Sequence, residues 1–318
     1  MSVIEQAAKR LQELRKAGVG VEQPEVPLKG KPISESSSKG DTSVPSRRVG
    51  AGLSPQGTSL EVSPSPILSP QRQARSSSSA SAENRIVIDL QGLAEKGIVT
   101  PSDPRALVSE EFRVIKRPLL RNAAGKTAGT IKNANLIMVT SALPGEGKTT
   151  SALSLAMSIA LEMDKTVLLV DADVAKPSVL RVLGIEERRG LLDVLVDDSV
   201  DLSDVLLRTN VENLVVLPSG RTHARATELL ASDDMAHLVD EIAGRYPDRI
   251  IVFDSPPLLL TNEARVLAAH MGQIVIVVES GRTLNSSVQQ ALTTIETCPV
   301  KLLMLNKMRG VSTGNYYG

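Results

Sequence analysis

The stretch SALPGEGKTT, from Ser141 to Thr150, decides the fold class of this chain. The apolar run 136–139 precedes it, and a helical pattern over 152–161 follows it. The glycines let backbone N–H groups curve around phosphate oxygens, and the positive end of the helix dipole faces the same anion. Strand, glycine-rich loop and helix in this order predict a phosphate-binding loop, or P-loop.

The spacing within this loop assigns roles to its residues. Gly147, Lys148 and Thr149 complete the pattern A/G-x-x-x-x-G-K-[ST], with Ala142 at its first position. We expect Lys148 on the β- and γ-phosphates of a nucleoside triphosphate and Thr149 on Mg²⁺, whereas a glycine-rich turn that binds nothing is the alternative. The predicted ATP-binding residues of the loop are Pro144, Gly145, Glu146, Gly147, Lys148, Thr149 and Thr150.

Composition limits the classes of function that the chain can have. Its 318 residues carry 36 Lys+Arg and 36 Asp+Glu, so no surface dedicated to nucleic acid is expected. Cys298 is the one cysteine, which excludes an intramolecular disulfide, and the three histidines lack metal-ligand spacing. The sequence shows neither an apolar signal core nor an apolar run of about 18 residues. We therefore expect a cytoplasmic chain that reaches the membrane only through a partner.

Residues 1–18 carry the pattern of an amphipathic helix. Ser2 and Glu5 have the spacing of a capping box, and Gly18 is placed as a stop. Two interpretations stay open for this segment, a docking helix for a partner and a terminal helix without a role. Its apolar positions are Ile4, Ala7, Leu11 and Leu14.

Composition also sets the remaining domain boundaries. Ser, Pro, Gly and charged residues dominate 19–83, which predicts a disordered linker because such a segment cannot bury enough apolar surface to order itself. Residues 84–308 form the predicted P-loop domain, and 309–318 form a flexible C-terminal tail.

Apolar runs alternate with helical patterns throughout the predicted domain. The expected strands are 85–90, 135–140, 166–171, 213–217, 249–254, 273–278 and 300–305. The expected helices are 104–120, 149–162, 177–183, 190–196, 227–244, 262–269 and 285–296. This alternation predicts an α/β fold, with a mostly parallel sheet covered by helices on both faces and ligands at the carboxyl ends of its strands.

Two acidic motifs follow predicted strands of this sheet. Asp171 and Asp173 begin DADVAKP, and Asp254 begins DSPP. An NTPase needs carboxylates near Mg²⁺ and a group that orients or deprotonates the nucleophile. We predict Asp173 and Asp254, with Thr149, as metal-binding residues, and either Asp171 or Asp173 as the base. A lone Asp at a strand end more often caps a helix, but three such carboxylates facing a P-loop favour the catalytic interpretation.

These three motifs resemble the Walker A, A′ and B motifs of bacterial tyrosine autokinases of capsule and exopolysaccharide synthesis, which are P-loop NTPases of the MinD/ParA-like class. The resemblance runs from about residue 85 to the C-terminus and includes GLLDVL at 190–195 and ATELLAS at 226–232. The N-terminal segments resemble those of the cytosolic, exosortase-associated branch. The resemblance implies an ATP- and Mg²⁺-dependent protein-tyrosine kinase, with Lys148 and Asp171 or Asp173 as catalytic residues and Asn306 at the adenine edge.

Two of the three tyrosines, Tyr316 and Tyr317, lie in the sequence GNYYG at the C-terminus. The Gly/Ser/Thr-rich tail has no core to fill, so burial does not explain them. Ten extended residues span at most about 33–36 Å, so the tail can reach a nucleotide site. The resemblance implies that these tyrosines are phosphoacceptors, phosphorylated by a neighbouring subunit of a ring-like oligomer.

The family forms its oligomers through a helix with the motif E-x-x-R-x-x-R. This sequence has Glu110, Arg113 and Lys116 at that spacing, so the third position is changed. The resemblance implies that these residues contact another subunit. Ordinary surface charge with i, i+3 pairing is the alternative.

The chain also departs from related proteins at other positions. Leu143 stands where partitioning ATPases of the MinD/ParA type carry a further lysine, which favours the kinase. Ala175 replaces an expected arginine and leaves Lys176 as the nearest cation. Residues 223–227 stand where the family carries a proline-rich segment before the sequence ELL.

The family resemblance implies partners as well. They are a membrane-spanning polysaccharide chain-length protein that recruits the chain to the inner face of the membrane, further copies of the chain, and a cognate tyrosine phosphatase. The competing hypothesis is an ATPase that acts as a nucleotide-switched scaffold for a membrane partner, without kinase activity.

Overall fold

The computed structural model describes residues 84–126, 129–245 and 249–308. The predicted N-terminal helix, the linker and the tail with its tyrosines lie outside these residues, and their assignments stay predictions.

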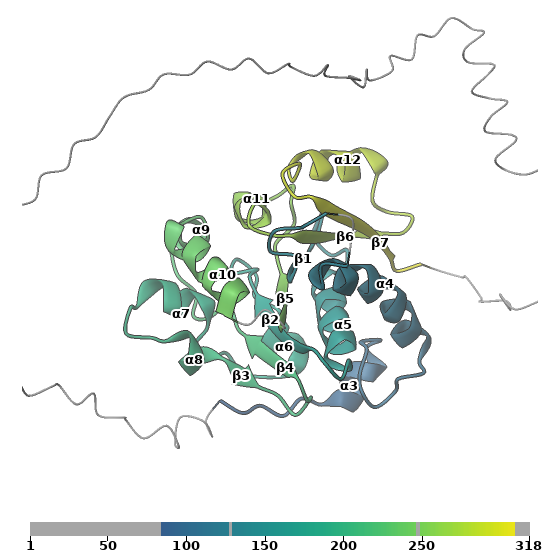
Figure 1. Cartoon of the computed structure of the whole chain (residues 1–318), viewed down its shortest axis with the longest axis horizontal. Coiled ribbons are helices and arrows are strands. Elements are labelled where there is room, and N and C mark those ends of the chain that lie inside the picture. The colour runs from purple at the N-terminus through teal and green to yellow at the C-terminus, as the bar shows by residue number, and fades with distance from the viewer. Residues whose placement is uncertain (1–83, 127–128, 246–248, 309–318) are drawn as a thin grey trace, which may run out of the picture. The chain divides into compact units, whose positions relative to one another are not determined.

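Seven strands form one sheet in the order β3-β4-β2-β5-β1-β6-β7, and all neighbours pair in parallel except β3 and β4 (Figure 1). This confirms the predicted α/β fold with a mostly parallel sheet. The strands are β1 (Leu136–Ser141), β2 (Thr166–Asp171), β3 (Leu207–Arg208), β4 (Leu214–Leu217), β5 (Arg249–Asp254), β6 (Gln273–Glu279) and β7 (Val300–Asn306).

Helices cover both faces of the sheet, with α4 and α5 on one side and α9 and α10 on the other (Figure 1). The helices are α3 (Leu90–Glu95), α4 (Leu107–Ala123), α5 (Lys148–Ala160), α6 (Val179–Leu183), α7 (Leu191–Val196), α8 (Leu202–Val205), α9 (Ala226–Leu230), α10 (Asp233–Arg245), α11 (Asn262–Ala268) and α12 (Asn285–Thr293).

The core has two apolar layers, one on each face of the sheet. In β1, Ile137 and Val139 belong to the layer under α5, whereas Leu136 and Met138 belong to the layer under α10 and α12. All six residues of β1 are buried, which explains why its sequence is apolar without alternation from Leu136 to Val139. Helix α5 is buried from residue 151 to 160, because it lies between the sheet and α4.

The predicted strand at 85–90 is wrong. Arg85 forms only a single bridge, to Arg208 of β3. The side chain of Asn210 then pairs with the backbone of Ile88, accepting from its N–H at 2.8 Å and donating to its carbonyl at 3.1 Å. An amide side chain therefore replaces the backbone ladder that a strand would need.

The single helix predicted over 227–244 is also wrong, because the structure has α9 and α10 in its place. The hydroxyl of Ser232 accepts a hydrogen bond from the N–H of Met235 at 3.2 Å and caps α10. Asp233 and Asp234 in the first turn favour the same helix start through the helix dipole. The sequence ASDD carried this signal.

Two short elements escaped the sequence analysis. Strand β3 has two residues and pairs antiparallel with β4, and α8 has four residues and is capped by Asp201, which accepts from the N–H of Ser203. Elements of this length are too short to show a period.

Candidate functional site

The P-loop connects β1 to α5, as the sequence predicts. Gly147 precedes the first residue of α5, Lys148, and has a left-handed backbone with φ of 99°. A Cβ atom at this position would also lie 2.2 Å from the side-chain nitrogen of Asn306. Only glycine fits this position, because both the backbone angle and the close approach exclude a side chain.

The side chain of Glu146 holds the loop together from inside. It is 2% exposed, and its carboxylate accepts from the N–H of Leu143 at 2.6 Å and from the hydroxyl of Thr283. The carboxylate of Glu146 thus contacts the loop and not a ligand. If Glu146 binds ATP as predicted, it does so through its backbone. Thr283 was not predicted, because no local pattern in the sequence connects it to the loop.

Two residues at the end of β7 also support the loop. The side-chain nitrogen of Asn306 donates to the carbonyl of Glu146 at 2.9 Å, and Nζ of Lys307 donates to the carbonyl of Gly145 at 2.5 Å. Lys307 also pairs with Glu279 at 3.2 Å. Asn306 therefore lies against the P-loop, and Lys307 is a supporting residue that the sequence analysis missed.

The sheet brings the two acidic motifs together. Strands β2 and β5 are neighbours, and their register pairs Asp171 with Asp254. Asp173 follows two residues later in the chain. All three residues are almost completely buried: Asp171 is 1% exposed, Asp254 is 0% exposed and Asp173 is 4% exposed.

Lys148 and Asp173 form an ion pair with 2.5 Å between Nζ and Oδ2. Both side chains are nearly buried, at 11% and 5% exposure. The cation of the P-loop and a carboxylate from 25 residues further along the chain are thus in direct contact. The other oxygen of Asp173 accepts from the N–H of Lys176 at 3.2 Å.

Asp171 has a structural contact. Its Oδ2 accepts from the N–H groups of Ser178 and Val179, at 3.0 and 2.9 Å, where α6 begins. Burial raises the pKa of Asp171 to about 6, against the lowering effect of these two hydrogen bonds. Its Oδ1 has no hydrogen-bond partner within the described part of the chain. Asp171 thus caps a helix, which was the alternative interpretation of an Asp at a strand end.

Asp254 is completely buried, and neither of its carboxylate oxygens has a partner at hydrogen-bond geometry among the residues that the structure describes, although the Thr149 hydroxyl lies close enough to affect its pKa. Burial raises its pKa to about 7, although the nearby charge of Lys148 and the Thr149 hydroxyl act in the opposite direction. A buried carboxylate without a hydrogen-bond partner lowers the free energy of unfolding, and a bound cation would remove this cost. The hydroxyl of Thr149 and the carboxylates of Asp173 and Asp254 are oxygen donors of the kind that Mg²⁺ prefers, so these residues fit the metal.

A cleft of about 510 Å³ opens beside Thr149 and Asp173. The P-loop forms one wall, and Asp173, Lys176 and Arg181 contribute charged groups to the lining. Pro257 and Leu260 add apolar surface, with Leu260 61% exposed. Arg181 and Leu260 were missed, because only the positions of α6 and of the turn after β5 bring them to the cleft.

Two of the three residues of the predicted oligomer motif lie on the surface of the structure, and the third is buried. Arg113 pairs with Glu110 on the surface of α4 and donates to the carbonyl of Pro104 at 3.0 Å. Lys116 is 5% exposed, and its Nζ reaches the carbonyl of Ser158 and the carboxylate of Glu162, both at 2.5 Å. Lys116 is therefore engaged inside the chain, and a contact with another subunit is left to Glu110 and Arg113.

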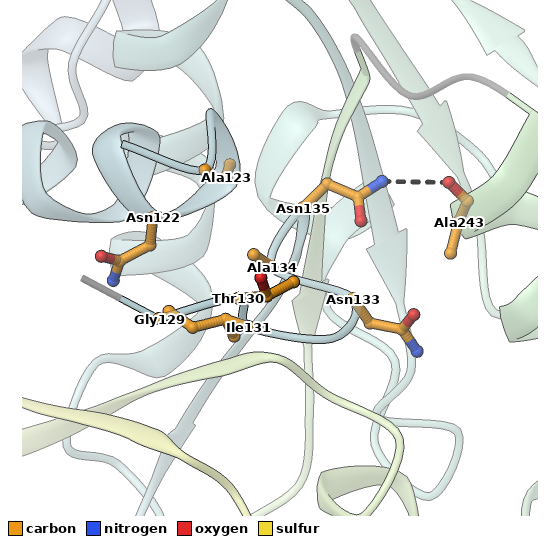
Figure 2. Close-up of a pocket in the computed structure, with 10 residues that line it drawn as sticks. Asn122, Ala123, Gly129, Thr130, Ile131, Asn133, Ala134, Asn135 and Ala243 are labelled. Carbon is orange, nitrogen blue, oxygen red and sulfur yellow. Dashed lines mark hydrogen bonds between the residues drawn. The ribbon is translucent and has the colours of Figure 1, made fainter. Parts of the chain in front are cut away.

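A second cavity of about 400 Å³ lies before the amino end of β1 (Figure 2). Three asparagines line it, and each amide already donates within the chain: Asn122 to Gln273, Asn133 to the carbonyl of His270 and Asn135 to the carbonyl of Ala243. None of the predicted site residues lines this cavity.

No helix within the described residues is long and apolar enough to cross a membrane.

Comparisons with known proteins agree with this geometry. Residues 134–307 match the family described as AAA domain. Tyrosine-protein kinase YwqD of Bacillus subtilis (strain 168) is 33% identical over 228 residues, which are 70% of this chain and 92% of YwqD. Tyrosine-protein kinase CpsD of Streptococcus agalactiae is 33% identical over 193 residues, 59% of this chain and 82% of CpsD. The crystal structure of the chimerical protein CapA2B2 superposes with a TM-score of 0.58 at 27% identity, covering 71% of this chain and 93% of that one.

Proposed function

This chain belongs to the family of bacterial tyrosine-protein kinases, and from that premise we propose that it is an ATP-dependent autokinase that phosphorylates Tyr316 and Tyr317 of its own tail. The observation that carries this proposal is the group of buried charges at the carboxyl edge of the sheet. The Lys148–Asp173 ion pair lies beside Asp254, a buried carboxylate without a partner at hydrogen-bond geometry among the described residues.

The transfer step needs charge stabilisation and a base. A phenol oxygen attacks the γ-phosphorus of ATP, the bond from that phosphorus to the bridging oxygen of ADP breaks, and the phenol proton passes to a carboxylate. Lys148 and the N–H groups at the start of α5 stabilise the negative charge on the transferred group. An ordinary tyrosine has a pKa near 10, so it needs a base at neutral pH.

We assign the base to Asp173 and a supporting role to Asp171. Asp173 lines the cleft, whereas Asp171 holds the start of α6 through two backbone N–H groups. A bound γ-phosphate competes with Asp173 for the ammonium group of Lys148. Binding of ATP would thereby free the carboxylate that accepts the tyrosine proton.

Thr149 and Asp254 are the residues that would hold Mg²⁺. Because Asp173 acts as the base, it would contact the metal only through a bound water molecule. When bound, Mg²⁺ supplies positive charge to the β- and γ-phosphate oxygens. Asp254 then gains the partner that it lacks among the described residues.

The family resemblance also supports a proposal for the role of this kinase in the cell. Phosphorylation in trans within a homo-oligomer, with Glu110 and Arg113 at the contact, would add about −1.5 to −2 charge per tyrosine and loosen the oligomer by repulsion. We propose that this cycle regulates exopolysaccharide polymerisation and export, with a membrane-spanning chain-length partner that recruits the cytoplasmic kinase to the inner face of the membrane. A tyrosine phosphatase would reverse the modification.

One experiment tests the kinase activity and its acceptors together. Purified full-length protein is incubated with ATP and Mg²⁺ and probed for phosphotyrosine, beside a Lys148→Ala variant and a Tyr316→Phe/Tyr317→Phe double variant. We expect signal only from the unmodified chain. Phosphotyrosine in the double variant, or ATP hydrolysis without any phosphotyrosine, contradicts the proposal, and the second result favours the nucleotide-switched scaffold.

A further inference from the structure

Beside the P-loop, two further walls of the cleft differ in chemistry. The turn after β5 contributes apolar surface, chiefly Pro257 and Leu260, and Leu260 is 61% exposed. The segment from Asp173 to α6 contributes two cations, Lys176 and Arg181. We call Lys176 and Arg181 together the cationic wall.

The charges of the cationic wall are not balanced. Both residues are exposed, and neither side chain has a hydrogen bond or an ion pair within the part of the chain that the structure describes. Among the described residues that line the cleft, Asp173 is the only carboxylate, and it already pairs with Lys148 at 2.5 Å. The cationic wall therefore has room for an anionic ligand.

The backbone fixes where the cationic wall lies. The N–H of Lys176 donates to the carbonyl of Asp173 at 3.0 Å and to its Oδ1 at 3.2 Å. Arg181 belongs to α6, whose start is held by Asp171 through two backbone N–H groups at 3.0 and 2.9 Å. Lys176 is thus held next to the carboxylate that we assign as the base, and Arg181 follows on the same wall.

This position fits the acceptor better than it fits ATP. The P-loop supplies phosphate ligands of its own, namely Lys148 and the N–H groups at the start of α5. The cationic wall belongs instead to the segment that carries the base. The acceptor tyrosine has to enter there, because a base must lie within hydrogen-bond reach of the phenol.

On the basis of the proposed kinase function, we propose that the cationic wall binds a phosphate on the residue next to the acceptor tyrosine. A phosphotyrosine carries about −1.5 to −2 charge at pH 7, and a guanidinium group binds phosphate through two parallel hydrogen bonds. Successive side chains of an extended peptide point to opposite sides. One tyrosine ring can therefore pack on Leu260 while the neighbouring residue reaches the cationic wall.

The inference predicts an order of events for adjacent tyrosines. Tyr316 and Tyr317 are neighbours in the sequence. Phosphorylation of the first creates the group that the cationic wall binds, so the second phosphorylation is faster than the first. The chemistry of the transfer step is the same in both.

Peptide substrates of the full-length protein test this preference. The enzyme carries Tyr316→Phe and Tyr317→Phe, so that only the added peptide is labelled. Peptides of residues 311–318 keep one tyrosine, and its neighbour is either phenylalanine or phosphotyrosine, placed before or after the acceptor. We expect the faster phosphotyrosine peptide to exceed its phenylalanine counterpart in kcat/KM by at least about tenfold.

Substitutions in the cationic wall test its part in the preference. Lys176→Ala together with Arg181→Ala should lower the ratio of the two kcat/KM values to within about twofold of unity. The ratio is taken within each variant, so a general loss of activity cancels. Arg117→Ala is the matched control, because it removes the same charge from an exposed position of α4 and should leave the ratio unchanged.

Four results overturn the inference. The first is equal kcat/KM for the phosphotyrosine and phenylalanine peptides, and the second is a preference that survives in the Lys176→Ala/Arg181→Ala variant. The third is an intact preference with a KM for ATP raised at least about tenfold, which would assign the cations to the nucleotide. The fourth is no transfer to any peptide, and the phosphotyrosine test on the full-length chain then shows whether the kinase function fails as well.

Discussion

The two ends of the sheet carry cavities of similar size and different chemistry. The cleft at the carboxyl end is about 510 Å³, and the cavity at the amino end of β1 is about 400 Å³ (Figure 2). At the amino end, side-chain amides such as that of Asn135 are satisfied within the chain. At the carboxyl end, Asp254 is buried with two unpartnered oxygens, as far as the structure describes the chain. Unsatisfied buried charge, more than volume, distinguishes the reactive end.

Removing the cation of the P-loop is expected to have the largest effect. Lys148→Ala should lower the rate of phosphotyrosine formation by at least about 10³-fold, because the transferred phosphoryl group loses its main charge partner. Thr130→Ala, which changes the lining of the amino-end cavity, is the control and should leave the initial rate within about twofold. A Thr130→Ala effect as large as that of Lys148→Ala would break the contrast between the two ends.

The two carboxylates of the DADVAKP motif should differ in effect. Asp173→Asn is expected to lower kcat by about 10²- to 10³-fold, because the amide cannot accept the tyrosine proton. Asp171→Asn keeps an acceptor oxygen for the N–H groups of Ser178 and Val179, so kcat should fall by less than about tenfold. Single-turnover phosphorylation measures both, and the reverse order would exchange the two assignments.

Asp254→Asn should raise the stability of the ligand-free protein and abolish its activity. The folded pKa of Asp254 is about 7 against an ordinary 3.8, so the folded chain binds this proton more tightly than the unfolded chain does. The carboxylate therefore lowers stability as pH rises from about 4 through 7, and Asn removes that loss. Urea unfolding should show a gain on the order of 2–4 kcal/mol at pH 8.

The same measurement contains its own control. The stability difference between Asp254→Asn and the unmodified protein should shrink steadily below pH 7, because Asp254 is then protonated in the folded state. A gain that is constant with pH would show that the charge of Asp254 is not its cause.

The smallest effect is expected from the amino-end cavity. Asn135→Ala removes the amide that donates to the carbonyls of Ala243 and Arg249, so the free energy of unfolding should fall by about 1–2 kcal/mol. The kinase rate should stay unchanged. A loss of activity in a fully folded Asn135→Ala protein would connect the two ends of the sheet.

Much of the fold followed from local sequence patterns. The apolar runs predicted six of the strands at nearly their observed positions. Five of these strands are largely buried on both faces and are therefore apolar, whereas β7 has one exposed face. The strand predicted over 85–90 failed because a distant side chain, that of Asn210, pairs with the backbone of Ile88. The single helix predicted over 227–244 failed for a different reason, because the local capping signal at Ser232 starts a second helix.

The same limit applies to the candidate site. The P-loop and the acidic motifs are visible as short patterns, since phosphate binding and metal binding require particular residues at close spacing. The support of the loop is not visible, because Thr283 and Lys307 reach it from far along the chain. Lys116 likewise kept the spacing of a surface motif, yet it is buried against α5.

By itself, the sequence determined that this chain has an α/β fold with a P-loop and acidic residues after two strands, because glycine-rich spacing and apolar periodicity are local properties. Only the tertiary structure decided which charges meet. The parallel register places Asp171 beside Asp254, and the loop geometry pairs Lys148 with Asp173. The structure also showed that the helical layer leaves one face of β7 open, because exposure depends on elements that are distant in sequence.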